Sequence, residues 1–206
     1  MNRRELLASL AAAPLASALV GGEINGGTAA QIRGLRAGYF PNVVLRTQDN
    51  KAVRFYDDLI KGKIVVINMF YTECEGLCPQ MTQNLKQVQK GLGSRVGRDI
   101  FMYSITLKPE SDGPQELKEY AAMHGIKPGW TLLTGTLADI DKLRRKLGFR
   151  DLDPVIDKDR SQHTGIIRYG NEALDRWAAC PALTNPKEII KYVLWMDPKA
   201  TEARKS

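Results

Sequence analysis

Three residues separate two cysteines, Cys74 and Cys78, within residues 71–79. Once a helix has begun, this spacing places the thiols at i and i+4 on one face, near enough to form a disulfide or to bind one soft metal ion. The free N–H groups and positive dipole at the start of a helix favour thiolate over thiol, which lowers a cysteine pKa. A purely structural disulfide is the alternative, but closing so short a loop would add little stability.

The elements that must position these thiols are a strand before them and a helix after them. Residues 64–70 form an apolar run typical of a buried strand, and residues 80–91 have apolar positions at helical spacing. Pro79 suits the first helical turn, where its missing N–H costs nothing. The sequence therefore predicts a strand, a turn that carries the two thiols, and a helix.

The rest of the chain alternates between strand and helix patterns. We expect a hairpin of residues 43–45 and 52–55, strands at 100–105 and 130–133, helices at 114–124 and 137–147, a polar loop through 157–160, a strand pair at 164–169 and 174–178 around a turn at 170–171, and a closing helix at 186–195. This order predicts an α/β, thioredoxin-like fold: a mixed central sheet flanked by helices, with an N-terminal β-hairpin.

Residues 1–20 differ from the rest of the chain. A basic start, an almost uncharged apolar stretch and a small-residue cleavage site are typical of an export signal. The pair Arg3 and Arg4 resembles a twin-arginine signal, and an uncleaved N-terminal anchor is the alternative. We therefore expect a periplasmic protein, either free or anchored in the membrane through this segment, whose thiols would be oxidised unless a reductant or a metal holds them.

Length and composition fit one folded domain. The chain has 206 residues, is 43% hydrophobic and carries a formal charge of +7. We expect a flexible linker at 21–38, a thioredoxin-like domain at 39–198 and a polar tail at 199–206. The basic residues are spread along the chain without interleaved aromatic residues, so a nucleic-acid partner is not expected. They fit either solvated helix faces or attraction to an acidic partner or anionic lipid, which would bring the protein close to a membrane.

The chain has two histidines, and they invite opposite interpretations. His124 stands at the end of an expected helix, where an imidazole commonly caps carbonyl groups or faces solvent. His163 precedes a strand at the end of a long loop, where side chains tend to converge on a site. A lone histidine is usually structural, but two thiolates and one imidazole form a recognised ligand set for copper.

An ordered set of landmarks over about residues 40–170 resembles the Sco/SenC family of copper-binding thioredoxin-like proteins. The landmarks are Phe70-Tyr71-Thr72-Glu73-Cys74, Cys78-Pro79, Ser104-Ile105-Thr106, Leu133-Thr134-Gly135-Thr136 and His163-Thr164. The resemblance implies a copper ion held by Cys74, Cys78 and His163 in a copper-binding domain at 39–198. It also implies a metallochaperone that supports assembly of the copper centre of a respiratory oxidase, with the oxidase subunit or another copper or thiol protein as partner.

A thiol–disulfide oxidoreductase is the main alternative, with Cys74 and Cys78 as a catalytic redox pair that acts on cysteines of a partner protein. His163 discriminates between the two hypotheses, because a metal chaperone needs the imidazole and disulfide exchange does not. Zinc is a further alternative, but two sulfurs and one histidine leave a closed structural site one ligand short.

The sequence departs from the family pattern at several positions. Lys108 and Gln162 stand where carboxylates are common, which predicts weaker retention of a doubly charged than of a singly charged copper ion. Cys180 is an odd third thiol, interpreted as a buried inert residue, with a resolving cysteine, an extra ligand or an intermolecular link as alternatives. Met69 and Met81 flank the cysteines and are expected in the core.

Overall fold

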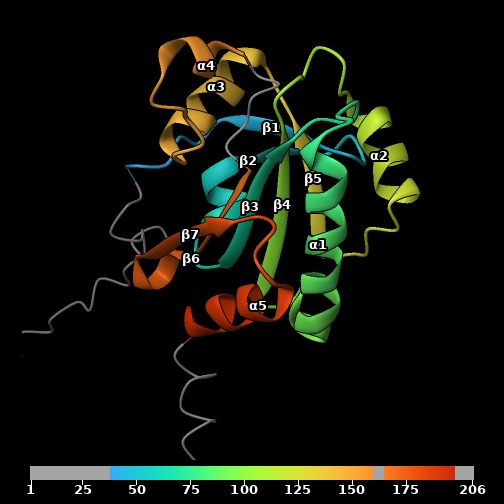
Figure 1. The fold of residues 1–206 in the computed structure, drawn as a ribbon. Coiled ribbons are helices and arrows are strands. Elements are labelled where there is room, and N and C mark those ends of the chain that lie inside the picture. The colour runs from blue at the N-terminus through green and yellow to red at the C-terminus, as the bar shows by residue number, and fades with distance from the viewer. Residues whose placement is uncertain (1–37, 160–164, 198–206) are drawn as a thin grey trace, which may run out of the picture. The chain divides into compact units, whose positions relative to one another are not determined.

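The computed structural model describes residues 38–159 and 165–197 (Figure 1). The expected signal, nearly all of the expected linker, the whole expected tail, Gln162 and His163 lie outside these ranges. The strands are β1 (Val44–Thr47), β2 (Ala52–Arg54), β3 (Ile64–Phe70), β4 (Ile100–Thr106), β5 (Trp130–Thr134), β6 (Ile166–Asn171) and β7 (Arg176–Pro181). The helices are α1 (Leu77–Leu92), α2 (Pro114–Met123), α3 (Leu137–Lys146), α4 (Pro154–Lys158) and α5 (Pro186–Trp195), with short helical turns η2 (Phe55–Ile60), η3 (Gly93–Arg95) and η4 (Glu172–Leu174).

The strands form one mixed sheet of seven in the order β2-β1-β5-β4-β3-β6-β7. The three central strands β5, β4 and β3 are parallel, and antiparallel pairs flank them on both sides. Side chains of β3 alternate between two apolar clusters, one against α1, α2 and α5 and the other against η2 and α3. Because helices cover both faces, β3 is buried along its whole length.

The predicted α/β, thioredoxin-like class is confirmed, and most predicted elements lie within a few residues of the observed ones. Helix α1 begins at Leu77, earlier than predicted, with Pro79 in its first turn as expected. The prediction that both thiols lie on one helix was wrong, because Cys74 precedes the helix. The expected polar loop through residue 157 was also wrong in part, since Pro154 and the Asp153 side chain, which accepts a hydrogen bond from the Val155 N–H, start the short helix α4.

The turn between β6 and β7 differs from the prediction as well. Strand β6 continues through residues 170–171, where we expected the reversal, and the chain turns at η4 instead. The cause is Glu172, which is buried and accepts hydrogen bonds from the Tyr56 hydroxyl (2.7 Å) and the Gly62 N–H (2.8 Å). These contacts from a distant segment fix the turn, and no local sequence pattern reports them.

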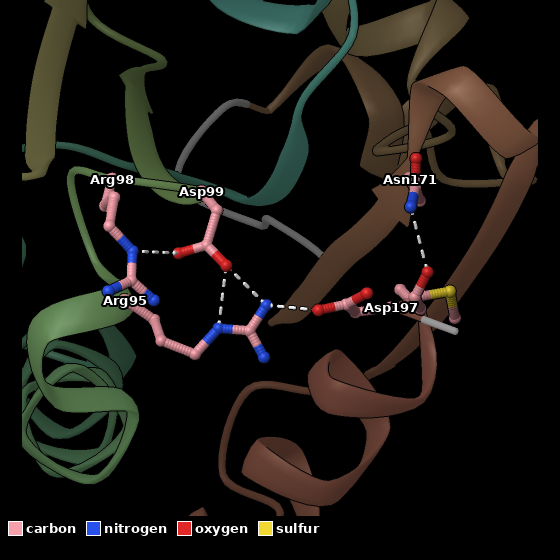
Figure 2. Close-up of polar contacts among 6 residues, drawn as sticks. Arg95, Arg98, Asp99, Asn171 and Asp197 are labelled. Carbon is pink, nitrogen blue, oxygen red and sulfur yellow. Dashed lines mark hydrogen bonds and ion pairs between the residues drawn. The ribbon is translucent and has the colours of Figure 1, made fainter. Parts of the chain in front are cut away.

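A polar clasp fastens the end of α5 to the segment between α1 and β4 (Figure 2). The Arg95 guanidinium lies 2.6 Å from an Asp99 carboxylate oxygen and 2.5 Å from an Asp197 carboxylate oxygen. The Asn171 amide donates to the Met196 carbonyl at 2.9 Å. These contacts therefore join the segment after α1, the end of β6 and the residues that follow α5. Within the described ranges, no helix is both long and apolar enough to cross a bilayer.

Candidate thiol and metal site

The two thiols meet at the start of α1. Cys74 lies in the turn after β3, and Cys78 lies in the first turn of the helix. Both are buried and neither forms a disulfide. The N-cap residue, Gly76, has no side chain to accept the first free N–H groups of α1, and the Cys78 N–H donates to the Cys74 sulfur at 3.4 Å instead. The Cys74 sulfur therefore occupies the place of a capping acceptor.

The surroundings shift the pKa values of the two thiols in opposite directions. Burial opposes charge on Cys74, but hydrogen bonds from the Cys78 side chain and N–H, the Tyr71 side chain and the Gly76 N–H outweigh it and lower the Cys74 pKa. Burial raises the pKa of Cys78, and the hydrogen bond that the Cys78 thiol gives to Cys74 adds to the shift. The arrangement therefore favours a thiolate on Cys74 with Cys78 as its neutral partner.

Tyr71 and Lys108 complete the polar surroundings of Cys74. Burial raises the pKa of Tyr71 to about 12, and the hydrogen bond to Cys74 adds to the shift, so the phenol stays protonated and donates. The Lys108 ammonium lies 4.3 Å from the centre of the Tyr71 ring. Lys108 therefore brings a positive charge close to the thiol turn.

Asp112, in the connection between β4 and α2, fixes the turn that carries Cys74. Its side chain is fully buried. The carboxylate accepts hydrogen bonds from the Thr72 N–H (3.1 Å), the Thr72 hydroxyl and the hydroxyl of Thr106 at the end of β4. The Leu107 N–H also donates to the Phe70 carbonyl at 2.8 Å. The ends of β3 and β4 are thus joined where the turn that carries Cys74 begins.

The described residues on either side of the segment that contains His163 interact with Leu77 and Tyr71, which are close to the cysteines in the sequence. The positive-φ residue Gly165 approaches Leu77 so closely that an added Cβ would lie 2.5 Å from a Leu77 methyl carbon. On the other side, the charge of Asp159 contributes to the raised pKa of Tyr71. Counting only the side chains that the structure describes, no group of three or more His, Cys, Asp and Glu could hold a metal. His163 itself lies outside the described residues, so the predicted three-ligand site stays a prediction.

The remaining residues singled out in the sequence lie apart from this pair or in the core. His124 caps α2, with its N–H bonded to the Tyr120 carbonyl and its ring centre 4.2 Å from that of Tyr120. Met69 and Met81 are buried in the core, as expected. Cys180 lies half-buried on β7, where burial raises the pKa of its thiol against a hydrogen bond from Thr184.

Two contributors to the site were missed by sequence reasoning. Tyr71 and Asp112 both act on the turn, one by a hydrogen bond to Cys74 and the other by hydrogen bonds to Thr72. Tyr71 stood in the sequence only as part of the landmark that contains Cys74, and no role was predicted for it. Asp112 precedes Gly113 and Pro114, so it looked like an ordinary helix-start residue. Its full burial in a loop is the feature that marks it, and burial of a polar loop residue is not visible in the sequence.

A buried strand that ends in a two-thiol turn and a helix, within this mixed sheet, defines a thiol protein of the thioredoxin-like class. The family model described as SCO1/SenC matches residues 44–194. The chain therefore belongs to the SCO1/SenC family.

Individual relatives agree with this assignment. An SCO1 protein homolog of Bacillus subtilis is 33% identical over 91 residues, which is 44% of this chain and 46% of that protein. The chain therefore aligns with less than half the length of this curated relative. A SCO1/SenC family lipoprotein of Bacillus anthracis has a TM-score of 0.63 at 24% identity, over 76% of this chain and 94% of that one.

Two further solved structures share the fold. Bradyrhizobium japonicum ScoI, solved with copper bound, has a TM-score of 0.60 at 24% identity, over 74% of this chain and 96% of that one. BsSco, described as a Sco family protein of cytochrome c oxidase assembly with a disulfide switch, also has a TM-score of 0.60 at 24% identity, over 75% of this chain and 91% of that one. At these identities the structures establish a common fold, which confirms the thioredoxin-like prediction.

Proposed function

We propose that this protein is a copper metallochaperone that supports assembly of the copper centre of a respiratory oxidase. The observation that carries the proposal is the pair of free thiols, Cys74 and Cys78, held together in the turn after β3. A lowered pKa on Cys74 supplies the thiolate that soft metal ions prefer. Family membership and the copper-bound Bradyrhizobium structure make copper the expected cargo.

His163 is the proposed third ligand. It stands two residues before Gly165, so it lies within about 7 Å of that residue along the chain. Gly165 is packed on Leu77, the immediate neighbour of Cys78. An imidazole in this position would complete a set of two sulfurs and one nitrogen, which suits singly charged copper.

Copper transfer would then proceed by ligand exchange. A thiolate of the acceptor forms a bond to copper as the bond to one cysteine breaks, and a second exchange releases the other cysteine. Cys74 is the slightly more exposed of the two (7% against 0%), so it is the first to be displaced. The released thiolate is stabilised where it lies by the hydrogen bonds from Cys78, Tyr71 and Gly76.

The Lys108 ammonium close to the turn favours the singly charged copper ion. Lys108 places an ammonium group against Tyr71, and the carboxylate of Asp112 is occupied by donors from Thr72 and Thr106. A nearby positive charge repels a doubly charged ion more than a singly charged one, so the Lys108 ammonium weakens retention of the doubly charged ion more. This supports the expectation drawn from Lys108 and Gln162.

The proposal includes a location and a partner. Residues 1–20 serve as an export signal or membrane anchor, residues 21–38 as a linker and residues 39–198 as the copper-binding domain, so the site faces the periplasm. The acceptor is the copper-binding subunit of the oxidase or another copper or thiol protein. The relation of BsSco to cytochrome c oxidase assembly supports this choice.

A thiol–disulfide oxidoreductase is the second candidate, and the same pKa difference favours it. A thiolate on Cys74 would attack a partner disulfide sulfur, forming a mixed disulfide and releasing the partner's thiolate. Cys78 would then lose its proton and attack the Cys74 sulfur. This step leaves an intramolecular disulfide and a fully reduced partner.

An anaerobic titration separates the two functions. The reduced protein is titrated with singly charged copper against a competing chelator, alongside His163→Ala and Cys78→Ser, with Cys180→Ser as the matched thiol control. We expect one tightly held copper that is weakened at least about tenfold by either site substitution and unchanged by Cys180→Ser. No tight copper, or binding indifferent to His163, would reject the chaperone proposal and favour the oxidoreductase.

A further inference from the structure

A groove of about 490 Å³ runs along the carboxyl half of α1, away from the cysteines. One wall is the face of α1 that carries Lys86 and Lys90, and the other is the connection from α2 to β5, including Gly125, Lys127 and Pro128. Lys86 lies eight residues beyond Cys78, which is about 12 Å along a helix. A ligand in this groove would leave the thiols uncovered.

The groove is positively charged, and no acidic residue in its lining offsets that charge. Its lining includes three lysines, Lys86, Lys90 and Lys127, and no acidic residue. Among the residues that the structure describes, none of these three ammonium groups forms an ion pair. Burial lowers the pKa of neighbouring His124, and the charge of Lys86 lowers it further. The groove therefore presents a positive potential without a carboxylate of its own.

The walls of the groove are joined firmly. The Gln89 amide donates to the Lys127 carbonyl at 2.8 Å and accepts from the Lys127 N–H at 3.2 Å. Directly after Pro128 in the sequence, the chain passes so close to Gly97 that a Cβ on Gly129 would lie 2.5 Å from the Gly97 nitrogen. The connection cannot move toward or away from α1 without breaking these contacts, so the groove is preformed and binding would require little ordering.

We propose that this groove binds an acidic polypeptide segment of a partner protein, with an apolar side chain in the groove and carboxylates against the three lysines. Charge complementarity selects an anionic ligand. Val96, Pro128 and the aliphatic lysine stems supply apolar surface for the side chain. The amides of Gln83 and Gln87 can hydrogen-bond the peptide groups beside it. A flat bilayer surface cannot enter a recess between two elements, whereas an extended chain can.

The test uses the full chain without metal, so its outcome is independent of the proposed copper function. The probe is a short fluorescent peptide of alternating glutamate and leucine, and the control peptide has glutamine in place of glutamate. The groove variant is Lys86→Glu/Lys90→Glu/Lys127→Glu. The matched control is Lys51→Glu/Lys142→Glu/Lys187→Glu, which changes the net charge equally at exposed lysines outside the groove.

We expect the acidic peptide to bind and the groove variant to lose at least about tenfold in affinity, while the control variant keeps most of it. Lys→Gln substitutions at the same three groove positions, which keep the stems, should lose affinity in the same direction. Amide resonances of Gly93 and Gly125 should shift on titration. Any one of four results would overturn the proposal. Two concern the acidic peptide: no binding at all, or an equal loss of affinity in both Glu variants. The other two are equal binding of the glutamine peptide, and groove-dependent binding only to vesicles containing phosphatidylglycerol.

Discussion

The segments before and after α1 are held by carboxylates in different surroundings. At the amino end, Asp112 is fully buried and accepts hydrogen bonds from a backbone N–H and two hydroxyl groups. At the carboxyl end, Asp99 and Asp197 pair with Arg95, and the Asp99 side chain is 38% exposed (Figure 2). One end relies on a desolvated charge with dedicated donors, and the other on ion pairs that water can partly replace.

The difference shows where the fold demands geometric accuracy. Water partly screens a partly exposed ion pair such as Arg95–Asp99 and can replace its partners when it breaks, so such a pair tolerates movement. A buried carboxylate whose donors are lost has no replacement partner, so its geometry is enforced. The thiol turn is attached to the second kind of contact, which suits a site whose two sulfurs must stay together.

Removal of the buried carboxylate should have the largest effect. Asp112→Ala leaves the Thr72 N–H and the hydroxyls of Thr72 and Thr106 without their acceptor. We expect a loss of about 3 kcal/mol or more in the free energy of unfolding, measured by urea denaturation. We also expect faster alkylation of Cys74, because the turn is released.

The control for that change is Asp49→Ala, which removes an exposed carboxylate that pairs with the exposed Lys118. It should change the unfolding free energy by less than about 0.5 kcal/mol. A loss for Asp112→Ala as small as that of the control would show that the buried carboxylate does not fasten the turn.

Breaking the clasp should have an intermediate effect. Arg95→Ala removes a guanidinium that is 19% exposed and leaves Asp197, 17% exposed, without this partner. We expect a loss of about 1–2 kcal/mol in the same denaturation experiment, with no change in Cys74 alkylation. The matched control is Arg98→Ala, because Arg98 is 67% exposed and should matter little. A change in Cys74 reactivity in Arg95→Ala would contradict the independence of the two ends.

The hydroxyl of Thr72 should contribute less than the whole carboxylate. Thr72→Val keeps the shape and the backbone bond to Asp112 but removes the hydroxyl donor. We expect a loss of about 1 kcal/mol and a moderate increase in Cys74 alkylation. Thr136→Val, which removes an exposed hydroxyl bond to Asp139, should leave the alkylation rate unchanged. Equal alkylation rates in the two variants would show that the Thr72 hydroxyl does not hold the turn in place.

Acid should weaken the clasp by the smallest amount. Burial opposes charge on Asp99, but hydrogen bonds and charge from Arg95, with a contribution from Arg98, lower its pKa below the ordinary 3.8. Since the folded pKa is the lower one, this stabilisation is present above about pH 3.8 and is lost as pH falls through the folded value. The decrease in unfolding free energy below this pH should be smaller in Asp99→Asn. If Asp99→Asn leaves the decrease in unfolding free energy below about pH 3.8 unchanged, the Arg95–Asp99 pair makes no contribution to stability.

The sequence predicted those features that depend on local pattern. The apolar run of β3, the helix period of α1 and the place of Pro79 in its first turn followed from residue types alone. The proximity of Cys74 and Cys78 also followed from their spacing in the sequence. What could not be predicted depends on contacts across the fold: Glu172 fixes the β6–β7 turn through Tyr56 and Gly62, and Asp112 holds the thiol turn across 40 residues.

The central claim is that the turn presents Cys74 and Cys78 as a pair for one copper ion with His163 as third ligand. X-ray absorption at the copper edge, on protein loaded with one equivalent of singly charged copper, tests it most directly. The account predicts two sulfur ligands and one imidazole nitrogen, with the imidazole contribution lost in His163→Ala and the spectrum unchanged in Cys180→Ser. A spectrum with fewer than two sulfurs, or one unaffected by His163→Ala, would contradict the account.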